Sequence, residues 1–478
     1  PTRVFSDDRI DAMHETALRV LEELGVKILL PEARALFRAA GARVDEETEM
    51  VWIGREIVEQ GLKTAPRSIR MRAGARHKDV TLELGRLIFQ PGAGAPHATD
   101  LVRGRRPGTQ SDFRDLVQLT QHFDALQIIP PLVEPQDVPT HLRHYSMTET
   151  LLSQTNKVPF VYGRGTGQAT ECFEMIRDFR ELSDDAFQAE PHCYTIVNTN
   201  SPRQIDIPMA MALVDFARMG QLVVVTPFTL MGAMAPITVA GALTLSHAEA
   251  MAAITLNQLA RPGAPVTYGT FTSSVDMKSG APAMGTPEQV KATLGAGQLA
   301  RRLGLPWRCA AGSAANINDV QAAHETELSG WGCLMAGSTL MIHSAGWLES
   351  GLTVSYEKLI TDMEMVQSMA ELCQDTPAGE DEIGFEALCE VDPGGHFFAT
   401  AQTMDRYQTA FYEPLVADFT NFGTWSERGS VDANTRATGI WQNILAQFTP
   451  PETSGDRLAA LRDFIDRRTA AGGAPPES

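Results

Sequence analysis

The sequence predicts an α/β protein built on a (β/α)₈ TIM barrel, with an N-terminal helical and small-sheet segment and a C-terminal helical extension. Two observations predict this class. Eight short apolar runs lie between residues 87 and 343, as buried parallel strands do. Each run is followed by a stretch long enough for a crossover helix. The even spacing shows no break into halves, which favours a closed barrel over an open doubly wound sheet.

Residues 1–86 form the predicted N-terminal segment. Helical spacing of apolar residues predicts two helices within residues 7–40, with Ser6 as an N-cap and Gly25 ending the first helix. Alternating apolar residues then predict a small antiparallel sheet from Ser68-Ile-Arg-Met-Arg and Val80-Thr-Leu-Glu-Leu.

Residues 87–350 form the predicted barrel. Its strands are expected at Leu87-Ile-Phe-Gln-Pro, Leu126-Gln-Ile-Ile-Pro, Pro159-Phe-Val-Tyr-Gly, Cys193-Tyr-Thr-Ile-Val-Asn, Leu222-Val-Val-Val-Thr-Pro, Pro265-Val-Thr-Tyr-Gly, Pro306-Trp-Arg-Cys-Ala and Thr339-Leu-Met-Ile-His. Helices are predicted between these strands, for example at Met209–Met219, Leu243–Leu259 and Pro287–Leu303.

Residues 351–478 form the predicted C-terminal extension. Helices are expected at Leu359–Cys373, Thr403–Ala410, Asp432–Gln447 and Gly455–Ala471. The small, polar and Pro/Gly-rich tail from Ala470 to Ser478 is expected to be frayed.

Composition argues against several classes of protein. The net charge of −19 leaves no basic footprint for nucleic acid, and the basic run Arg103–Arg106 reads as a solvated loop. Six widely spaced cysteines without a Cys-x-x-Cys pair predict a reduced cytoplasmic protein. We expect no signal peptide, and no apolar stretch near the roughly 20 residues that a membrane span requires.

Chemistry in such a barrel is expected at the carboxyl ends of the strands. This rule selects polar residues with interleaved aromatic ones. The candidate substrate-binding residues are His97, Arg164, Asn198, Asn200, Phe228, Thr229, Tyr268, Phe271, Thr272, Ser313, Asn316 and Trp347. Glu134 and the third strand's Gly163 and Gly165 lie at the same level.

The aromatic candidates Phe228, Tyr268, Phe271 and Trp347 would suit a quaternary ammonium, which aromatic faces can hold without hydrogen bonds. Each could equally be a core residue, and His343 could be a hydrogen-bonded core histidine. Gly163-Arg-Gly-Thr-Gly167 only weakly suggests a nucleotide site, since the third glycine of the fingerprint is missing. No converging ligand set predicts a metal site.

The stretch from Gly337 to Glu364 carries a specific pattern. His343 is followed by Gly-Trp-Leu-Glu-Ser-Gly-Leu, then Ser-Tyr-Glu at 355–357 and Asp-Met-Glu at 362–364. This pattern resembles the trimethylamine methyltransferase (MttB-like) superfamily. Further agreement lies in Leu21–Val26, Ser313–Gln321, Gly395-His-Phe-Phe and around Trp425, so the resemblance covers nearly the whole chain.

The resemblance implies a barrel enzyme that transfers a methyl group from a methylamine to the Co(I) corrinoid of a partner protein. No tightly bound cofactor is implied, and the Asp-x-His-x-x-Gly signature of corrinoid modules is absent. Standard residues stand where relatives carry pyrrolysine, a position expected within residues 310–320, which indicates the branch acting on glycine betaine and related amines. His343 and Glu349 are assigned catalytic roles by resemblance, and a homo-oligomer is implied.

Three functions remain open. The first is methyl transfer from a quaternary amine such as glycine betaine, which leaves as a neutral tertiary amine and needs no general acid. The second is the same reaction with another methylamine, such as carnitine, proline betaine or trimethylamine. The third is a cytoplasmic betaine-binding protein without turnover. A betaine carboxylate could be bound by Arg164, His343 or His97.

Overall fold

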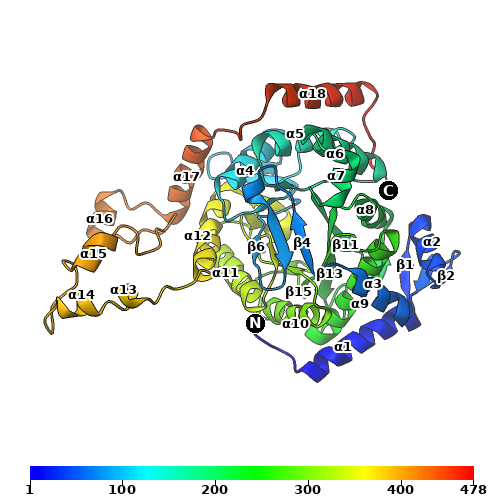
Figure 1. The fold of residues 1–478 in the computed structure, drawn as a ribbon, viewed down its shortest axis with the longest axis horizontal. Helices are drawn as coiled ribbons and strands as arrows, with labels where there is room; N and C mark the ends of the chain where they lie inside the picture. Colours follow the sequence, from blue (N-terminus) through cyan, green and yellow to red (C-terminus); the bar gives the residue numbers. More distant parts are fainter. Residues whose placement is uncertain (478) are drawn as a thin grey trace.

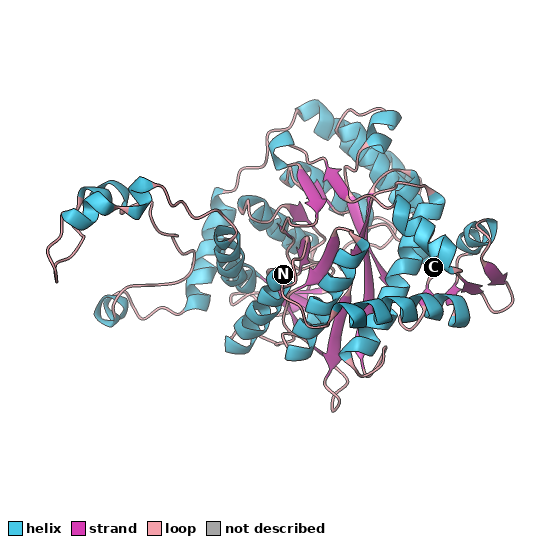
Figure 2. Cartoon of the chain, turned by 60° about the horizontal axis from the view of Figure 1, so that its bottom comes forward, coloured by secondary structure: helices cyan, strands magenta, loops and turns pink. Residues whose placement is uncertain are grey.

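The computed structural model describes residues 1–477 and has a mixed α/β architecture, in which helices surround a set of parallel strands (Figures 1 and 2). The N-terminal segment lies along one side of this body. It contains α1 (Asp7–Arg19), a π-helical turn (Val20–Leu24), β1 (Val26–Ile28), α2 (Pro31–Ala39), β2 (Arg43–Asp45), β3 (Met50–Trp52) and α3 (Arg55–Thr64).

The two helices predicted within residues 7–40 are confirmed as α1 and α2. Gly25 ends the π-helical turn that continues α1, with φ 73°, a backbone conformation that favours glycine. The predicted antiparallel sheet is confirmed as β4 (Ser68–Met71) paired with β5 (Val80–Glu83), which are joined by a 3₁₀ turn at Arg76–Lys78. Strand β12 (Gln204–Ile205) adds to β1 in parallel, so the N-terminal segment is tied to the main body.

All eight predicted apolar runs contain strands. They are β6 (Ile88–Phe89), β9 (Ile128–Ile129), β10 (Val158–Pro159), β11 (Tyr194–Thr199), β13 (Leu222–Met231), β14 (Val266–Gly269), β17 (Trp307–Ala310) and β18 (Leu340–Ile342). Ladders pair β9 with β10, β11 with β13, β13 with β14, β14 with β17, β17 with β18 and β18 with β6, all in parallel. Parallel bridges Phe89–Leu126 and Phe160–Tyr194 link the remaining neighbours.

Helices alternate with these strands, and capping residues determine where they begin and end. They are α4 (Gln110–His122), α5 (Arg143–Gln154), α6 (Thr166–Phe179), α7 (Asp184–Ala189), α8 (Ile207–Arg218), α9 (Val239–Ala260), α10 (Pro287–Leu303) and α11 (Val320–Met335). Helix α10 matches its predicted limits because Thr286 caps it, Pro287 occupies its first turn and Gly304 ends it in the left-handed region.

Helix α9 is long and apolar enough to cross a membrane by length and composition, which the sequence analysis did not anticipate. Within the fold, 72% of its most apolar window is buried. The helix contacts β13, α1, α3, α8 and α10, so its apolar surface is covered by the protein itself.

Short strands follow the parallel strands at their carboxyl ends and build the loops around the site. They are β7 (His97–Thr99), β8 (Arg106–Pro107), β15 (Phe271–Val275), β16 (Pro282–Ala283), β19 (Trp347–Leu348) and β20 (Thr353–Ser355). A sheet in the order β19-β20-β7-β8 brings the loop after the first parallel strand against the loop after the last.

The C-terminal extension begins with α12 (Tyr356–Leu372). Residues 373–431, here called the arm, project away from the body in both views (Figures 1 and 2) and carry α13 (Glu380–Ile383), α14 (Phe385–Cys389), α15 (Ala401–Arg406) and α16 (Phe422–Glu427). The chain then returns as α17 (Ala433–Gln447) against α12 and as α18 (Gly455–Ala470) against α5 and α6.

Candidate active site

A cavity of about 810 Å³ lies at the carboxyl ends of the parallel strands. This volume falls within the range of small-molecule sites. Its wall combines aromatic, polar and small residues, and includes Ala93, Gly94, Pro131, Glu134, Phe160, Tyr162, Gly163, Arg164, Thr195, Ile196, Asn198, Pro208, Met209, Ala212, Thr226, Phe228, Phe271, Arg308, His343, Trp347, Ser350, Gly351, Leu352, Pro476 and Glu477.

Four aromatic rings meet at one side of the cavity. The Phe228 and Phe271 rings stack with centroids 4.9 Å apart, and Phe271 meets Trp347 edge-on at 5.8 Å. The His343 imidazole stacks on Trp347 at 4.0 Å with only 5° between the ring planes. All four residues line the cavity, and aromatic rings can hold a methylated cation.

Glycines hold the Trp347 indole in place. A Cβ atom on Gly312 would lie 2.5 Å from the indole, and one on Gly351 would lie 2.3 Å from it. Both positions also have positive φ, 130° and 102°. Any larger residue at either position would therefore displace the ring from the cavity wall.

His343 is a neutral histidine in a strained backbone. Its φ is 59°, uncommon for a residue other than glycine, and its Nδ1 accepts a hydrogen bond from the Ala93 backbone N–H at 3.3 Å. Burial, followed by the nearby Arg308 guanidinium, holds the pKa of His343 well below its ordinary value. With Nδ1 as acceptor, the proton lies on Nε2, so the ring can donate one hydrogen bond.

Another part of the wall is a paired ionic network. Glu134 accepts hydrogen bonds from the Tyr162 hydroxyl and from Arg143, the latter at 3.2 Å. Arg164 donates through Nε to the same Tyr162 hydroxyl at 3.1 Å. Burial, reinforced by Glu134, raises the pKa of Tyr162, so the phenol stays protonated. The charges on this wall are thus largely satisfied by one another.

The predicted fraying of the tail is wrong for the residues that the structure describes. Ala474 is buried and donates from its backbone to His141, and the Glu477 backbone donates to Arg164. The Glu477 carboxylate accepts from the Gly167 N–H at the start of α6, 3.1 Å away. The tail finds backbone partners at His141 and Arg164 and further partners at Gly167 and Gln168 on α6, which composition does not reveal. Ser478 lies outside the described residues.

Six of the predicted site residues line the cavity: His343, Arg164, Asn198, Phe228, Phe271 and Trp347. The other eight lie outside its lining: Glu349, His97, Asn200, Thr229, Tyr268, Thr272, Ser313 and Asn316. The rule that selects strand ends therefore finds the rim at which the cavity lies, but it does not tell which side chains point into the cavity.

Several of the eight are held by structural contacts. Glu349 forms a bidentate ion pair with Arg105. Asn200 pairs with Asp206, the N-cap of α8, while Asn316 is exposed on its loop. His97 contacts the Leu352 carbonyl oxygen at 3.2 Å.

Three of them belong to buried hydroxyl networks. The Tyr268 hydroxyl faces His247 on α9, with 3.0 Å between the phenol oxygen and Nδ1. Thr229 and Thr272 hydrogen-bond to each other, 2.5 Å apart. Tyr268 thus connects β14 to α9, and the two threonines connect β13 to β15; none of the three lines the cavity.

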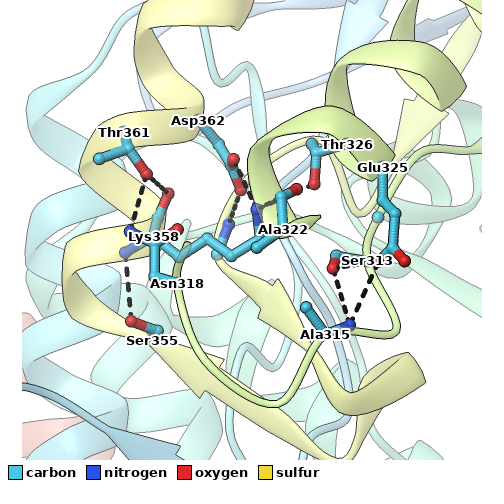
Figure 3. A network of polar contacts seen from close by, with 12 residues as sticks. Ser313, Ala315, Asn318, Ala322, Glu325, Thr326, Ser355, Lys358, Thr361 and Asp362 are labelled. Atoms are coloured by element: carbon cyan, nitrogen blue, oxygen red, sulfur yellow. Dashed lines mark hydrogen bonds and ion pairs between the residues drawn. The ribbon is translucent and has the colours of Figure 1, made fainter. Parts of the chain in front are cut away.

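Figure 3 shows what surrounds the remaining predicted residue, Ser313. Its hydroxyl donates to Glu325 at 2.6 Å, which fixes the loop after β17 to α11. In the same network the buried Lys358 donates to Asp362 at 2.8 Å and to Thr326 at 2.9 Å.

The acidic residues of the family pattern hold loops and segments in place. Asp362 accepts from the Gly346 backbone N–H, in the turn between His343 and Trp347. Glu357 accepts from Trp441 on α17, and Glu364 accepts from backbone amides where the arm returns to the body. The acidic residues of the family pattern thus mainly position the loops and helices around the cavity.

Sequence reasoning missed Arg308, which lies within a strand that it treated as uniformly apolar. Side chains alternate along a strand, so a charged residue between Trp307 and Cys309 was the available signal. It also missed Tyr162 and Glu477. Among residues 1–477, no group of three or more His, Cys, Asp or Glu side chains could hold a metal ion.

Comparison with known proteins decides the family. The family model of trimethylamine methyltransferase (MTTB) matches residues 1–473. The chain belongs to the trimethylamine methyltransferase family. The resemblance and the prediction of a methyltransferase are confirmed.

Relatives of this methyltransferase match nearly its full length. It is 30% identical to glycine betaine methyltransferase of Desulfitobacterium hafniense (strain Y51), covering 97% of both chains. It is 28% identical to trimethylamine methyltransferase MttB of Desulfitobacterium hafniense (strain DSM 10664 / DCB-2), covering 97% of this chain and 93% of the relative. A solved hydroxylamine complex of MtmB aligns with 9% identity and a TM-score of 0.48, covering 98% of this chain and 93% of that chain.

Proposed function

We propose that this methyltransferase transfers a methyl group from a quaternary amine, glycine betaine or a similar compound, to the Co(I) corrinoid of a partner protein. The observation that carries the proposal is the aromatic cluster of Phe228, Phe271, Trp347 and His343 in the cavity wall. A relative named glycine betaine methyltransferase, 30% identical over nearly the whole chain, supports the choice of amine.

The residues of the site suit a reaction without proton transfer. A quaternary nitrogen leaves as a neutral tertiary amine once its methyl group is removed, so no acid has to protonate it. His343 is neutral and the carboxylates of the wall are paired. In this proposal the residues bind the cation, exclude water from it and aim one methyl group outward.

The corrinoid supplies a strongly nucleophilic cobalt that accepts the methyl group. The cavity has the volume of a small-molecule site, which supports the corrinoid's arrival on a separate protein. Loops around the carboxyl ends expose apolar side chains that suit a docking partner: Leu101, Val102, Ile237, Met277, Ile317 and Leu352. We assign this rim to the partner protein.

We also propose that the eight parallel strands close into a barrel. A closed (β/α)₈ barrel over residues 87–350 is supported by eight parallel strands whose last member, β18, pairs with the first, β6. Residues 1–86 and 351–478 are then the N-terminal segment and the C-terminal extension. We also propose a cytoplasmic location, where cysteines stay reduced; all six are free.

The test is a transfer assay with free cob(I)alamin and glycine betaine. We expect the cob(I)alamin absorbance to fall only when protein and betaine are both present, while dimethylglycine accumulates. Carnitine, proline betaine and trimethylamine, assayed in parallel, would reveal a different methylamine as the substrate. Tight binding of glycine betaine without any transfer would contradict the proposed reaction and leave a binding protein.

A further inference from the structure

Arg308 lies in the wall of the cavity, where it is a buried cation without an anionic partner among residues 1–477. Its side chain is 2% exposed. Nη1 donates to the Thr270 carbonyl oxygen at 2.8 Å, but the buried Nε has no hydrogen-bond partner. Among residues 1–477, no Asp or Glu side chain forms an ion pair with it. Burial lowers the pKa of Arg308 to about 10, so the group stays charged at neutral pH.

The fold makes room for this arginine. A Cβ atom on Gly269 would lie 2.6 Å from Cγ and 3.0 Å from Cδ of Arg308, so the stem of the side chain crosses β14 where only glycine fits. Gly269 also approaches the Val225 carbonyl oxygen too closely for a side chain. The guanidinium is therefore held in one place by the strand beside it.

An unpaired buried guanidinium is costly, because the protein does not replace the water and counter-ion that it has lost. The other charges of the wall cannot supply the missing anion. Glu134 is engaged with Arg143 and Tyr162, and Glu477 with the start of α6. The missing anion must therefore come from a bound ligand.

We propose that Arg308 binds a carboxylate of the substrate, which makes the substrate a zwitterion with a quaternary ammonium and a carboxylate. This inference rests on the proposed function and narrows its substrate class. It also replaces Arg164 as the carboxylate anchor, since Arg164 already interacts with Tyr162 and Glu134.

The positions of the groups fit a compact betaine. The Arg308 Cζ lies 5.6 Å from the centroid of the Phe271 ring, which belongs to the aromatic cluster. In glycine betaine one methylene joins nitrogen and carboxylate through bonds of about 1.5 Å each, so both groups can be contacted at once. A cation without a carboxylate would instead meet an uncompensated positive charge and be repelled.

Isothermal titration with three probes tests the inference: glycine betaine, tetramethylammonium, and 3,3-dimethylbutanoate, which has the same shape without the positive charge. Wild-type protein should bind glycine betaine more tightly than either of the others. R308Q should lose about 30-fold or more in affinity for glycine betaine. The same variant should bind tetramethylammonium at least as well as wild type, which also shows that it is folded.

Two matched variants complete the experiment. R180Q removes a half-buried arginine whose pKa is likewise lowered to about 10, outside the cavity lining, and should keep the wild-type preference. R164Q should keep it as well. Equal losses for all three probes in R308Q, or loss of the preference in R164Q instead, would overturn the assignment of Arg308.

The outcomes distinguish a failure of this inference from a failure of the proposed function. If wild type binds tetramethylammonium as tightly as glycine betaine, the role of Arg308 is wrong while a quaternary-amine site remains. If wild type binds no quaternary amine at all, both the proposed function and this inference are wrong.

Discussion

At the residue scale, the aromatic part of the site depends on uncharged side chains that are held rigidly. His343 is stacked on Trp347, hydrogen-bonded to Ala93 and kept neutral by burial. Its positive φ places strain at the carboxyl end of β18, and strain of this kind is commonly retained where function requires it. We propose that this neutral, fixed imidazole orients the substrate.

Replacing this ring tests that role. We expect His343→Ala to leave circular dichroism and the cooperative thermal transition unchanged while turnover falls by about 100-fold or more, because misplacing reacting groups by about 1 Å has a cost of that size. Steady-state kinetics with glycine betaine provide the measurement. Turnover equal to that of wild type would mean that His343 only fills the core.

At the element scale, side chains of α12 hydrogen-bond to the loop after β18 and to α11, and so fix the loop that contains Trp347. Lys358 and Asp362 are one turn apart on this helix, and their side chains are 0% and 6% exposed. Asp362 also accepts from Gly346, so the helix fixes the turn between His343 and Trp347.

Breaking this buried pair should affect stability and the site together. We expect Asp362→Ala to lower the free energy of unfolding by about 3–5 kcal/mol, since Lys358 is left buried and unpaired. Urea denaturation measures the loss. A double variant, Lys358→Met with Asp362→Leu, should recover much of it; an equal loss in both proteins would contradict the ion-pair account.

Helices α1 and α9 are joined by a second buried contact, between His14 and His247, whose ring nitrogens lie 2.9 Å apart. Burial first, and then Arg302, lowers the pKa of His14 to about 4, and burial lowers that of His247 well below its ordinary value. Both rings are therefore neutral in the folded protein at neutral pH.

The contact predicts loss of stability in mild acid. Between pH 6.5 and about 4 the unfolded chain binds a proton at His14 that the folded protein does not, so stability falls as pH falls through this range. We expect His14→Gln to show a smaller decrease in melting temperature between pH 7 and pH 5. Parallel melting curves for the two proteins would contradict the burial of a neutral His14.

At the scale of the whole molecule, local pattern predicted much of the fold. Runs such as Leu222–Pro227 are apolar because a parallel strand covered by helices is buried on both faces, so all eight strands were visible in the sequence. The site was less predictable, because direction and pairing depend on distant residues. The position of the Arg308 side chain requires a glycine at Gly269 on the neighbouring strand. The placement of the tail depends on contacts with α6, which lies more than 300 positions earlier in the chain.

The arm contacts the body where it returns, through Glu364, but most of its large apolar side chains are exposed. It exposes a series of large apolar residues, including Ile383, Phe385, Leu388, Phe398, Met404, Tyr407, Phe411, Phe419 and Phe422. Single subunits rarely expose so much apolar surface, which supports the proposed homo-oligomer, with the arm packed on a second copy.

Sedimentation tests the role of the arm. We expect wild-type protein to sediment as an oligomer, and the double variant Phe398→Ser, Phe411→Ser to shift toward the monomer with its thermal transition preserved. Substituting Leu24, an exposed apolar residue outside the arm, with Ser is the matched control and should not change the oligomer. A monomeric wild type would contradict the proposed assembly.

A crystal structure with glycine betaine tests most directly whether the cavity at the carboxyl ends of the strands holds a methylated zwitterion. We predict the trimethylammonium group against Phe228, Phe271 and Trp347, and the carboxylate within hydrogen-bond distance of Arg308. Glycine betaine bound elsewhere, or with its carboxylate on Arg164 and its methyl groups away from the aromatic rings, would contradict the account.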